Sequence, residues 1–394
     1  MAASARRGVL FAAVLLLGSG CTGEPDSTDR PATPSNEASS TTTAAVARLS
    51  PECPAPPDEP LGIASAQAAN ALMAGRDLPA WDAADIGASV RLTDGRIVWA
   101  FGDTLRKGMS PGIVSNSMLV TSGECASQLL PAQDGPVIPD EASDVVHWPM
   151  SIASWPNGSL EHLVVICSRI HRGGSGDPFD FAFLGTSAAV FDVPDNGVPR
   201  LRTVHRITPD NPNPAQVNWG AASFTDARWL YVYGTRLTGE HFVFGRELFV
   251  SRVPLASPSD RSTWRFWDGS EWQPEVKRAA VVLQAEGGVS QTLSVDDLGD
   301  GRYLAVSKRD GDFAEFVYSW SAPSPTGPWT PHKGVSAPSD LDKGLLQYAP
   351  LAHPEVRLDT GQLLVAVSRN TTDLRRLVED PDLGVPNFVE VALP

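Results

Sequence analysis

Residues 85–104 read DIGASVRLTDGRIVWAFGDT, with a hydrophobic run on each side of Asp94-Gly95. Asp-Gly between two such runs predicts a β-hairpin, because both residues accept a positive φ in a tight turn. The same order of strand, turn and strand returns at intervals of roughly 60–75 residues, which is typical of a repeat architecture. The other copies are Trp148 to Arg169, Trp219 to Thr235, Gln291 to Asp310 and Tyr348 to Asn370.

Five such hairpins predict an all-β fold, a five-bladed β-propeller. The second strand of each hairpin is β-branched and aromatic, as in Ile97 to Phe101, and such runs favour buried strands. Further strand-like segments at 188–191, 244–253 and 313–320 are enough for four strands per blade. Blades arranged radially leave only short sheet edges. A two-sheet sandwich is the alternative, although its turns recur more closely, about every 8–12 residues.

The C-terminal strand is expected to close the ring. Asn387 to Leu393 is apolar enough to pair with the first blade. One short helix is expected, at Ala64 to Ala74, because no other segment after the N-terminal region has a long amphipathic pattern.

The first 21 residues have the features of a lipoprotein signal peptide. Arg6 and Arg7 precede the apolar run Val9 to Leu17, and three small residues lead to Cys21. The run is too short for a permanent transmembrane helix, and small residues suit cleavage. We expect residues 1–20 to be removed and Cys21 to be lipidated, which would hold the protein on the extracytoplasmic side of the cell membrane. Ordinary secretion, with Cys21 cut away, is the alternative.

The segment after Cys21 is predicted to be a disordered tether. Residues 21–52 are rich in Ser, Thr and Pro and hold few large apolar side chains, so ordering them would not be offset by burial. Residues 53–394 are assigned to the propeller domain. The net charge of −15 would repel nucleic acid, which we exclude as a partner, and we expect a monomer.

The other cysteines are Cys53, Cys125 and Cys167. An oxidising compartment permits one disulfide among them and leaves one thiol, with the pairing open. The sequence has no Cys/His cluster of the kind that binds transition metals. We therefore predict no cofactor, while a calcium ion in the propeller channel is left open.

Two aspartates in the first hairpin are candidate catalytic residues. A two-residue turn at Asp94-Gly95 would make Asp85 and Asp103 diagonal neighbours at the open end of the hairpin. Two close carboxylates raise one pKa by repulsion, which gives an acid and a base at one pH. Glycoside hydrolysis uses such a pair at a separation that depends on stereochemistry, and the register leaves that outcome open. The alternative is that both residues only bond the backbone at strand ends.

The other hairpins supply candidate substrate-binding residues. Aromatic rings stack on sugar faces, while amide and guanidinium groups orient hydroxyls. Packing between blades is the alternative for any single aromatic residue. The candidates are Trp148, Asn218, Trp219, Gln291, Tyr348, His353 and Arg369. Three further acids could serve as a third carboxylate, namely Glu247, Glu315 and Glu355.

Several of these stretches resemble a bacterial family. Asp85 to Ser89 and Asp94 to Thr104 resemble the opening signature of domain-of-unknown-function family 4185, and the segments at 218–221, 324–329 and 348–355 are similar to it as well. The resemblance implies a five-bladed propeller with endo-D-arabinanase activity on mycobacterial-type cell walls. It also implies that Asp85 and Asp103 match the aspartates of the catalytic centre.

These observations lead to a hypothesis on function. The chain is interpreted as a surface lipoprotein that hydrolyses a furanose-containing envelope polysaccharide of the D-arabinan type. Two alternatives stay open, because one propeller can host unrelated functions. They are a non-catalytic carbohydrate-binding propeller and a scaffold that binds a protein partner.

Overall fold

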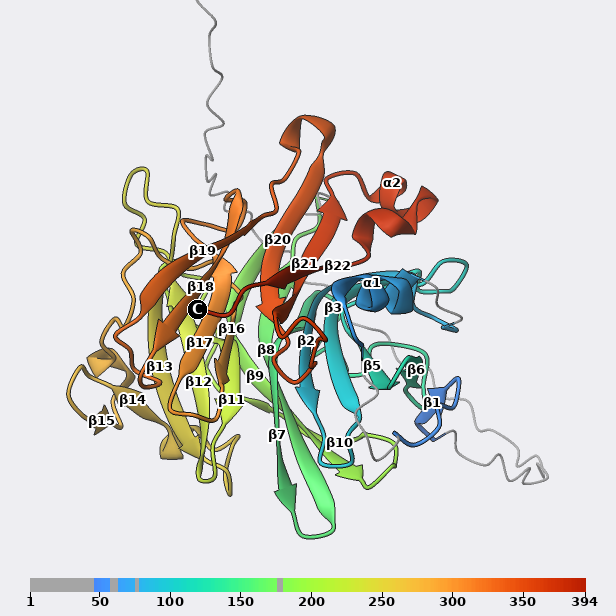
Figure 1. Ribbon diagram of the computed structural model, residues 1–394, viewed down its shortest axis with the longest axis horizontal. Helices are drawn as coiled ribbons and strands as arrows, with labels where there is room; N and C mark the ends of the chain where they lie inside the picture. The colour runs from blue at the N-terminus through green and yellow to red at the C-terminus, as the bar shows by residue number, and fades with distance from the viewer. Residues whose placement is uncertain (1–45, 57–62, 75–77, 176–179) are drawn as a thin grey trace, which may run out of the picture. The chain divides into compact units, whose positions relative to one another are not determined.

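The computed structural model describes residues 46–56, 63–74, 78–175 and 180–394, and its strands form five sheets (Figure 1). Each predicted hairpin supplies the two innermost strands of one sheet. The inner strand of each sheet contacts the inner strand of the next, and the last contacts the first. In order, these strands are β2 (Ala83–Arg91), β7 (Val145–Asn157), β11 (Asn218–Thr225), β16 (Ser294–Asp297) and β20 (Leu345–Ala352). The five-bladed propeller is therefore confirmed.

Only the second and fourth blades have the four strands expected for every unit. Blade 1 adds β3 (Ile97–Leu105), β4 (Ile113–Val114), β5 (Ser117–Ser122), β6 (Cys125–Leu130) and β1 (Arg48–Ser50) to β2. Blade 2 adds β8 (Leu160–Arg172), β9 (Phe181–Pro194) and β10 (Arg200–Arg206). Blade 3 adds β12 (Trp229–Arg236), β13 (Glu247–Pro254), β14 (Arg265–Trp267) and β15 (Trp272–Gln273). Blade 4 adds β17 (Tyr303–Lys308), β18 (Phe316–Ala322) and β19 (Thr330–Ser336), and blade 5 adds β21 (Leu363–Thr371) and β22 (Asn387–Val391).

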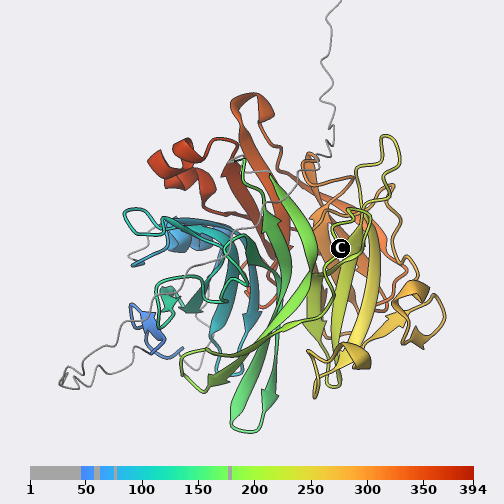
Figure 2. The ribbon, with the colours of Figure 1, turned by 180° about the vertical axis from the view of Figure 1, so that it is seen from behind.

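Helices are short and lie between strands. The α-helices are α1 (Ala66–Ala74), which confirms the predicted helix, and α2 (Leu374–Glu379). The 3₁₀ turns are Arg261–Thr263, Val276–Arg278, Leu341–Lys343 and Pro381–Gly384. The β7–β8 hairpin has 13 residues in each strand and projects beyond its neighbours in both views (Figure 2).

The first blade begins before Cys53. The short strand β1 pairs with β6 at the outer edge of this blade, so it lies inside the segment that was predicted to be tether. A disulfide joins Cys53, which follows β1, to Cys125, the first residue of β6, and Cys167 is a buried free cysteine. The lipidation prediction for Cys21 lies outside the described residues.

The ring closes without exchange of a strand, which corrects the prediction for the C-terminus. β22 pairs with β21 in its own blade, because a short helical connection returns the chain beside β21. The outer edge of β22 is covered by α1 instead of a fourth strand (Figure 1). The Asn70 amide accepts from the Phe388 backbone N–H at 2.8 Å and donates to the Phe388 carbonyl at 2.9 Å. One side chain thus satisfies both groups of an exposed edge.

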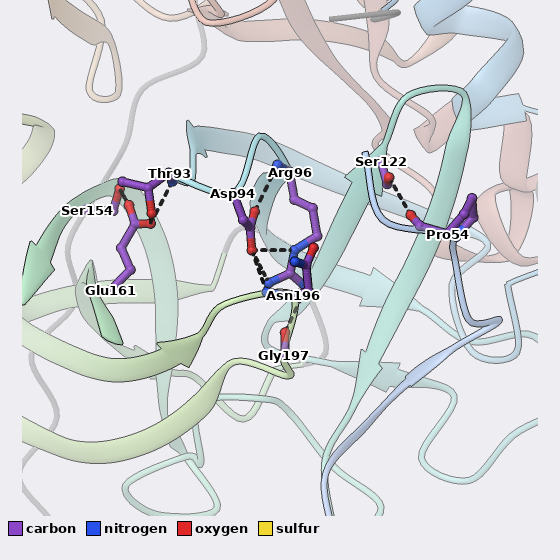
Figure 3. Close-up of polar contacts among 9 residues, drawn as sticks. All are labelled: Pro54, Thr93, Asp94, Arg96, Ser122, Ser154, Glu161, Asn196 and Gly197. Carbon is purple, nitrogen blue, oxygen red and sulfur yellow. Dashed lines mark hydrogen bonds and ion pairs between the residues drawn. The ribbon is translucent and has the colours of Figure 1, made fainter. Parts of the chain in front are cut away.

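The turn of the first hairpin is fastened to the second blade (Figure 3). The buried Glu161 carboxylate accepts from the Thr93 backbone N–H at 2.7 Å, the Thr93 hydroxyl at 2.8 Å and the Ser154 hydroxyl at 2.7 Å. Beside it, Asp94 accepts from the Arg96 guanidinium and the Asn196 backbone N–H. Burial opposes ionisation of Asp94, but the hydrogen bonds from Arg96 outweigh it and lower its pKa. The first two blades are therefore held in a fixed relation at the turn end of the first hairpin, which is the end away from Asp85 and Asp103.

Candidate active site

Asp85 and Asp103 lie opposite each other in blade 1, although the predicted register is wrong by one residue. The turn has three residues, since Leu92 pairs with Arg96 and Gly95 takes a φ of 89°. Bulges follow in both strands. Ala84 pairs with Thr104 and Ile86 with Phe101, so Asp85 alone opposes both Gly102 and Asp103. A bulge of this kind redirects a side chain, and here it keeps the two carboxyls together.

The backbone around Asp85 is strained. Ile86 has a φ of 69° and Gly87 a φ of 76°, and a β-branched residue in this region costs about 1–3 kcal/mol. The Ile86 N–H donates to the Ser368 hydroxyl of blade 5 at 2.9 Å, which holds the strained residue. A Cβ atom at Gly102 would collide with Asp85 Oδ1. Strain held in place by neighbouring blades is typical of functional positions.

Blade 5 supplies the partners of Asp85. The Tyr348 hydroxyl donates to Asp85 Oδ2 at 2.6 Å, and Asn370 Nδ2 donates to the same hydroxyl oxygen at 3.4 Å. Burial and the neighbouring Asp85 charge raise the pKa of Tyr348 well above its usual value. Tyr348 therefore stays neutral and donates a hydrogen bond to the Asp85 carboxylate.

Blade 2 supplies the partners of Asp103. Trp148 Nε1 donates to Asp103 Oδ1 at 2.9 Å, and the Arg172 guanidinium forms an ion pair with the same oxygen. Arg172 also lies 5.9 Å from the Trp148 ring centre, in a cation–π contact. The Asp103 side chain is 32% exposed, so a substrate can reach it.

The two carboxyls are electrostatically different. Burial raises the pKa of Asp103 to about 7, where Arg172 acts in the opposite direction and the Asp85 charge adds to the increase. Burial also raises the pKa of Asp85, while the Tyr348 hydrogen bond lowers it. Because the Tyr348 hydrogen bond favours the ionised form of Asp85, and the charge of Asp85 then raises the pKa of Asp103, we infer that Asp85 ionises first. Near neutral pH the pair can hold one proton, on Asp103.

Trp148 and Tyr348 are the predicted binding residues that contact the aspartates. Asn218 begins β11, where it is buried opposite Thr235, and Gln291 precedes β16 and accepts from Arg246 at 3.1 Å. No hydrogen bond among the described residues joins either side chain to the aspartates.

Three predicted binding residues lie elsewhere. Trp219 is buried in the core, with its ring 5.0 Å from that of Phe266, because it follows Asn218 and so points to the opposite face of β11. His353 is fully buried beyond the end of β20, where its ring lies 4.8 Å from that of Trp99. Arg369 alternates with Ser368 and Asn370 along β21, so it lies on the face of the strand away from Asp85.

Arg172 and Asn370 contact this site but were not among the predicted site residues. Both lie at or near the end of the second strand of a hairpin, as Asp103 does. The ends of second strands and the starts of first strands lie at the same end of a blade. Applying this rule to every hairpin would have included both residues among the candidates.

A separate cavity of about 400 Å³ is lined by residues on or next to the inner strands of all five blades. Neither aspartate lines it, so it is distinct from the site described above. Among the proposed third carboxylates, Glu355 lines this cavity, Glu247 pairs with Arg236, and Glu315 accepts from Ser336 at 3.4 Å. None of the three contacts the aspartates in the described part of the chain.

Within the described ranges, no group of three or more His, Cys, Asp or Glu side chains is placed to hold a metal ion. No described helix has both the length and the apolar character needed to cross a membrane.

The fold and the site define a five-bladed propeller with two opposed aspartates at the open end of the first hairpin of blade 1. The chain belongs to the family described as "Domain of unknown function (DUF5005)", whose model matches residues 74–392. This is not the family 4185 that the motifs resemble. The fold expected from that resemblance is nevertheless confirmed.

Two fungal proteins are similar to most of this chain. Notoamide biosynthesis cluster protein J of Aspergillus sp. (strain MF297-2) is 25% identical over 75% of this chain and 82% of its own length. Protein J' of Aspergillus versicolor is 24% identical over 74% of this chain and 81% of its own length.

Solved structures are similar to this chain over most of its length. A protein of Bacteroides ovatus, described as a "putative hydrolase", superposes with a TM-score of 0.62 at 17% identity, covering 82% of this chain and 89% of its own. An endo-arabinase of Bacteroides thetaiotaomicron gives a TM-score of 0.44 at 13% identity, covering 80% of this chain and 96% of its own.

Proposed function

We propose that this protein is a glycoside hydrolase that cuts a furanose-containing cell-envelope polysaccharide, with D-arabinan as its substrate and endo action as its mode. The observation that carries the proposal is the opposed pair Asp85 and Asp103, whose carboxyls have different hydrogen-bond partners and pKa values that are both raised by burial. Glycosidases need two carboxyl groups, one ionised and one protonated. The motif resemblance to family 4185 supports the choice of D-arabinan.

The roles follow from the ionisation order. Asp103, with a pKa of about 7, donates its proton to the glycosidic oxygen as the bond to the sugar carbon breaks. Asp85, as a carboxylate held by the Tyr348 hydroxyl, either takes a proton from the attacking water or attacks the sugar carbon itself. Arg172 stabilises the negative charge that Asp103 acquires when it has given up its proton.

The location of the protein belongs to the same proposal. Lipid attachment at Cys21 would hold the propeller on the extracytoplasmic side of the cell membrane, close to envelope polysaccharide. The Cys53–Cys125 disulfide supports an oxidising compartment.

Hydrolysis is tested by incubating the protein with purified mycobacterial-type arabinogalactan and separating the products by chromatography. We expect arabinose oligomers with the unmodified protein and none with Asp103→Asn. Arabinogalactan that is bound but not cut by the folded protein would instead support the carbohydrate-binding propeller. If this protein binds no glycan and another protein co-purifies with it, the protein-binding scaffold would be supported.

The rate should depend on pH through the same two groups. We expect kcat/KM to fall above pH 7, as Asp103 loses its proton, and to fall again at acid pH, where Asp85 becomes protonated. Arg172→Gln removes a charge that lowers the pKa of Asp103, so the alkaline limb should move to higher pH.

Arg236→Gln is a matched control for this shift. Arg236 also forms an ion pair, with Glu247, and is 37% exposed like Arg172, but it does not contact the aspartates. The measurement is the dependence of kcat/KM on pH for the unmodified protein, Arg172→Gln and Arg236→Gln. An alkaline limb that does not move in Arg172→Gln, or that moves equally in Arg236→Gln, would disprove the role of Asp103 as the acid.

A further inference from the structure

Most of the exposed large apolar side chains in the described ranges lie on connections at the end of the propeller where Asp85 and Asp103 lie. In each blade the first strand starts and the second strand ends here, so the loops that follow second strands belong to this end. Of the ten large hydrophobic residues exposed in the described ranges, seven lie on these connections or beside them. They are Phe181, Phe242, Phe244, Phe313, Leu341, Leu374 and Val378.

Two of these phenylalanines are linked to the catalytic pair by single ring contacts. The Phe181 ring meets the Trp148 ring edge-on at 4.9 Å, and Trp148 donates to Asp103. The Phe313 ring lies 6.4 Å from the Tyr348 ring, and Tyr348 donates to Asp85. A path of aromatic side chains therefore leads from each carboxyl to an exposed phenyl ring. Phe181 and Phe313 are 39% and 49% exposed.

A third phenylalanine extends the surface on the side of blade 4. The β12–β13 loop packs against the β17–β18 loop, since a Cβ atom at Gly311 would lie 2.9 Å from the Phe244 carbonyl oxygen and 3.1 Å from its Cβ. Phe244 is 67% exposed and belongs to a loop that touches the loop of Phe313. We call Phe181, Phe244 and Phe313 the phenyl rim.

The chemistry of the phenyl rim points to an apolar ligand. Binding surfaces for hydroxyl-rich ligands favour Tyr and Trp, whose rings carry a polar group, whereas Phe offers only an apolar face. Single exposed apolar residues are ordinary, but a group of them beside a site marks an interaction surface. The charge of −15 also disfavours docking on an anionic lipid surface.

We propose that the substrate carries an apolar acyl or aryl group close to the scissile bond, and that the phenyl rim binds this group. The proposal rests on the proposed function, because it places the apolar group beside the Asp85 and Asp103 pair. It adds a feature that a bare polysaccharide lacks. We assign the phenyl rim to the substrate and not to a separate partner, because Trp148 and Tyr348 each contact both a phenylalanine of the rim and one of the two aspartates.

The test compares three D-arabinofuranose oligosaccharides that differ only in the substituent at the leaving oxygen: a methyl, an octanoyloxyethyl and a 2-phenylethyl group. We expect kcat/KM for both apolar compounds to exceed that for the methyl compound by about 10-fold, through KM. Phe313→Ser and Phe181→Ser should each reduce this ratio several-fold. Val276→Ser is the control, because Val276 is 42% exposed but lies outside the phenyl rim. Its ratio should stay unchanged.

Binding separates this proposal from the proposed function. Titration calorimetry of Asp103→Asn with the same three compounds needs no hydrolysis and should show the same preference. Preferential binding without cleavage by the unmodified protein would reject the hydrolase and retain the apolar site. Cleavage with equal rates for all three compounds would reject the apolar site and retain the hydrolase.

Two further results would overturn the apolar site. A loss in the Phe variants that is equal for the methyl and the apolar compounds would show that the rings stack on sugar. Sedimentation of the protein with phosphatidylcholine vesicles, lost in Phe313→Ser and without any substituent preference, would assign the phenyl rim to a lipid surface. Absence of vesicle binding together with the substituent preference would support the proposal.

Discussion

Asp103→Asn is expected to lower kcat about 10²–10⁴-fold, the range for loss of a general acid. Asparagine keeps the size of the side chain, and its amide oxygen can still accept from Trp148 Nε1, but it has no proton to give to the glycosidic oxygen. Asp85→Asn should have an effect of at least the same size, because an amide neither activates water nor attacks the sugar carbon. Initial rates on arabinogalactan, with both variants at saturating substrate, measure the two losses.

Thermal unfolding supplies the control for both variants. The pKa of Asp103 is raised in the folded state, to about 7, so the folded protein binds a proton more tightly than the unfolded chain. The stability associated with this group is therefore full below the unfolded pKa of about 4 and falls as the pH rises to 7. Replacing the Asp103 carboxyl with an amide removes this decrease in stability at higher pH.

Asp103→Asn should thus unfold at pH 8 at the same temperature as the unmodified protein or at a higher one. A Tm several degrees lower would mean that the lost activity reports a damaged fold. Full activity in both Asp85→Asn and Asp103→Asn, with unchanged Tm, would remove the pair from the mechanism.

The blades could be predicted from sequence because their signals are local. A turn such as Asp94-Gly95 depends only on residues within the turn that accept a positive φ. The hydrophobic composition of the runs beside it predicts that these strands are buried. The closure of the ring could not be predicted, because it depends on which edge the last strand reaches. Nothing in Asn387 to Val391 distinguishes pairing with β21 from pairing with the first blade, and the role of Asn70 at that edge becomes visible only in the fold.

The site was predictable to the level of strand ends and no further. Asp85, Trp148 and Tyr348 were predicted because the starts of inner strands meet at one end of a propeller. The bulges in the first hairpin could not be predicted, because the positive φ of Ile86 is held by a hydrogen bond to Ser368, a residue far away in the chain. The face of the strand on which each side chain lies was also hard to predict, because a shift of one residue moves a side chain to the opposite face. Trp219 was assigned to the site for that reason and lies in the core.

Removing the disulfide is expected to be the most damaging change to stability. Cys53 and Cys125 are 72 residues apart, and chain entropy alone gives a stabilisation of about 4 kcal/mol for a loop of that size. The Cys53→Ser and Cys125→Ser double variant should therefore lose about this much unfolding free energy in guanidinium titrations. Cys167 does not compensate, because it is fully buried in blade 2.

Besides the disulfide, the segment after β1 is held to blade 1 by the Ser122 and Ser127 hydroxyls, which donate to the Pro54 and Pro51 carbonyls at 2.6 Å. β1 has three residues and pairs only with β6, so the disulfide supplies the covalent link between the start of the propeller and its first sheet. Adding reductant to the unmodified protein should reproduce the loss, while reductant should have no effect on the double variant. A loss below about 1 kcal/mol would show that this edge is stabilised by its strand pairing alone. In that case the disulfide would serve to anchor the N-terminal segment, without contributing to the stability of the blades.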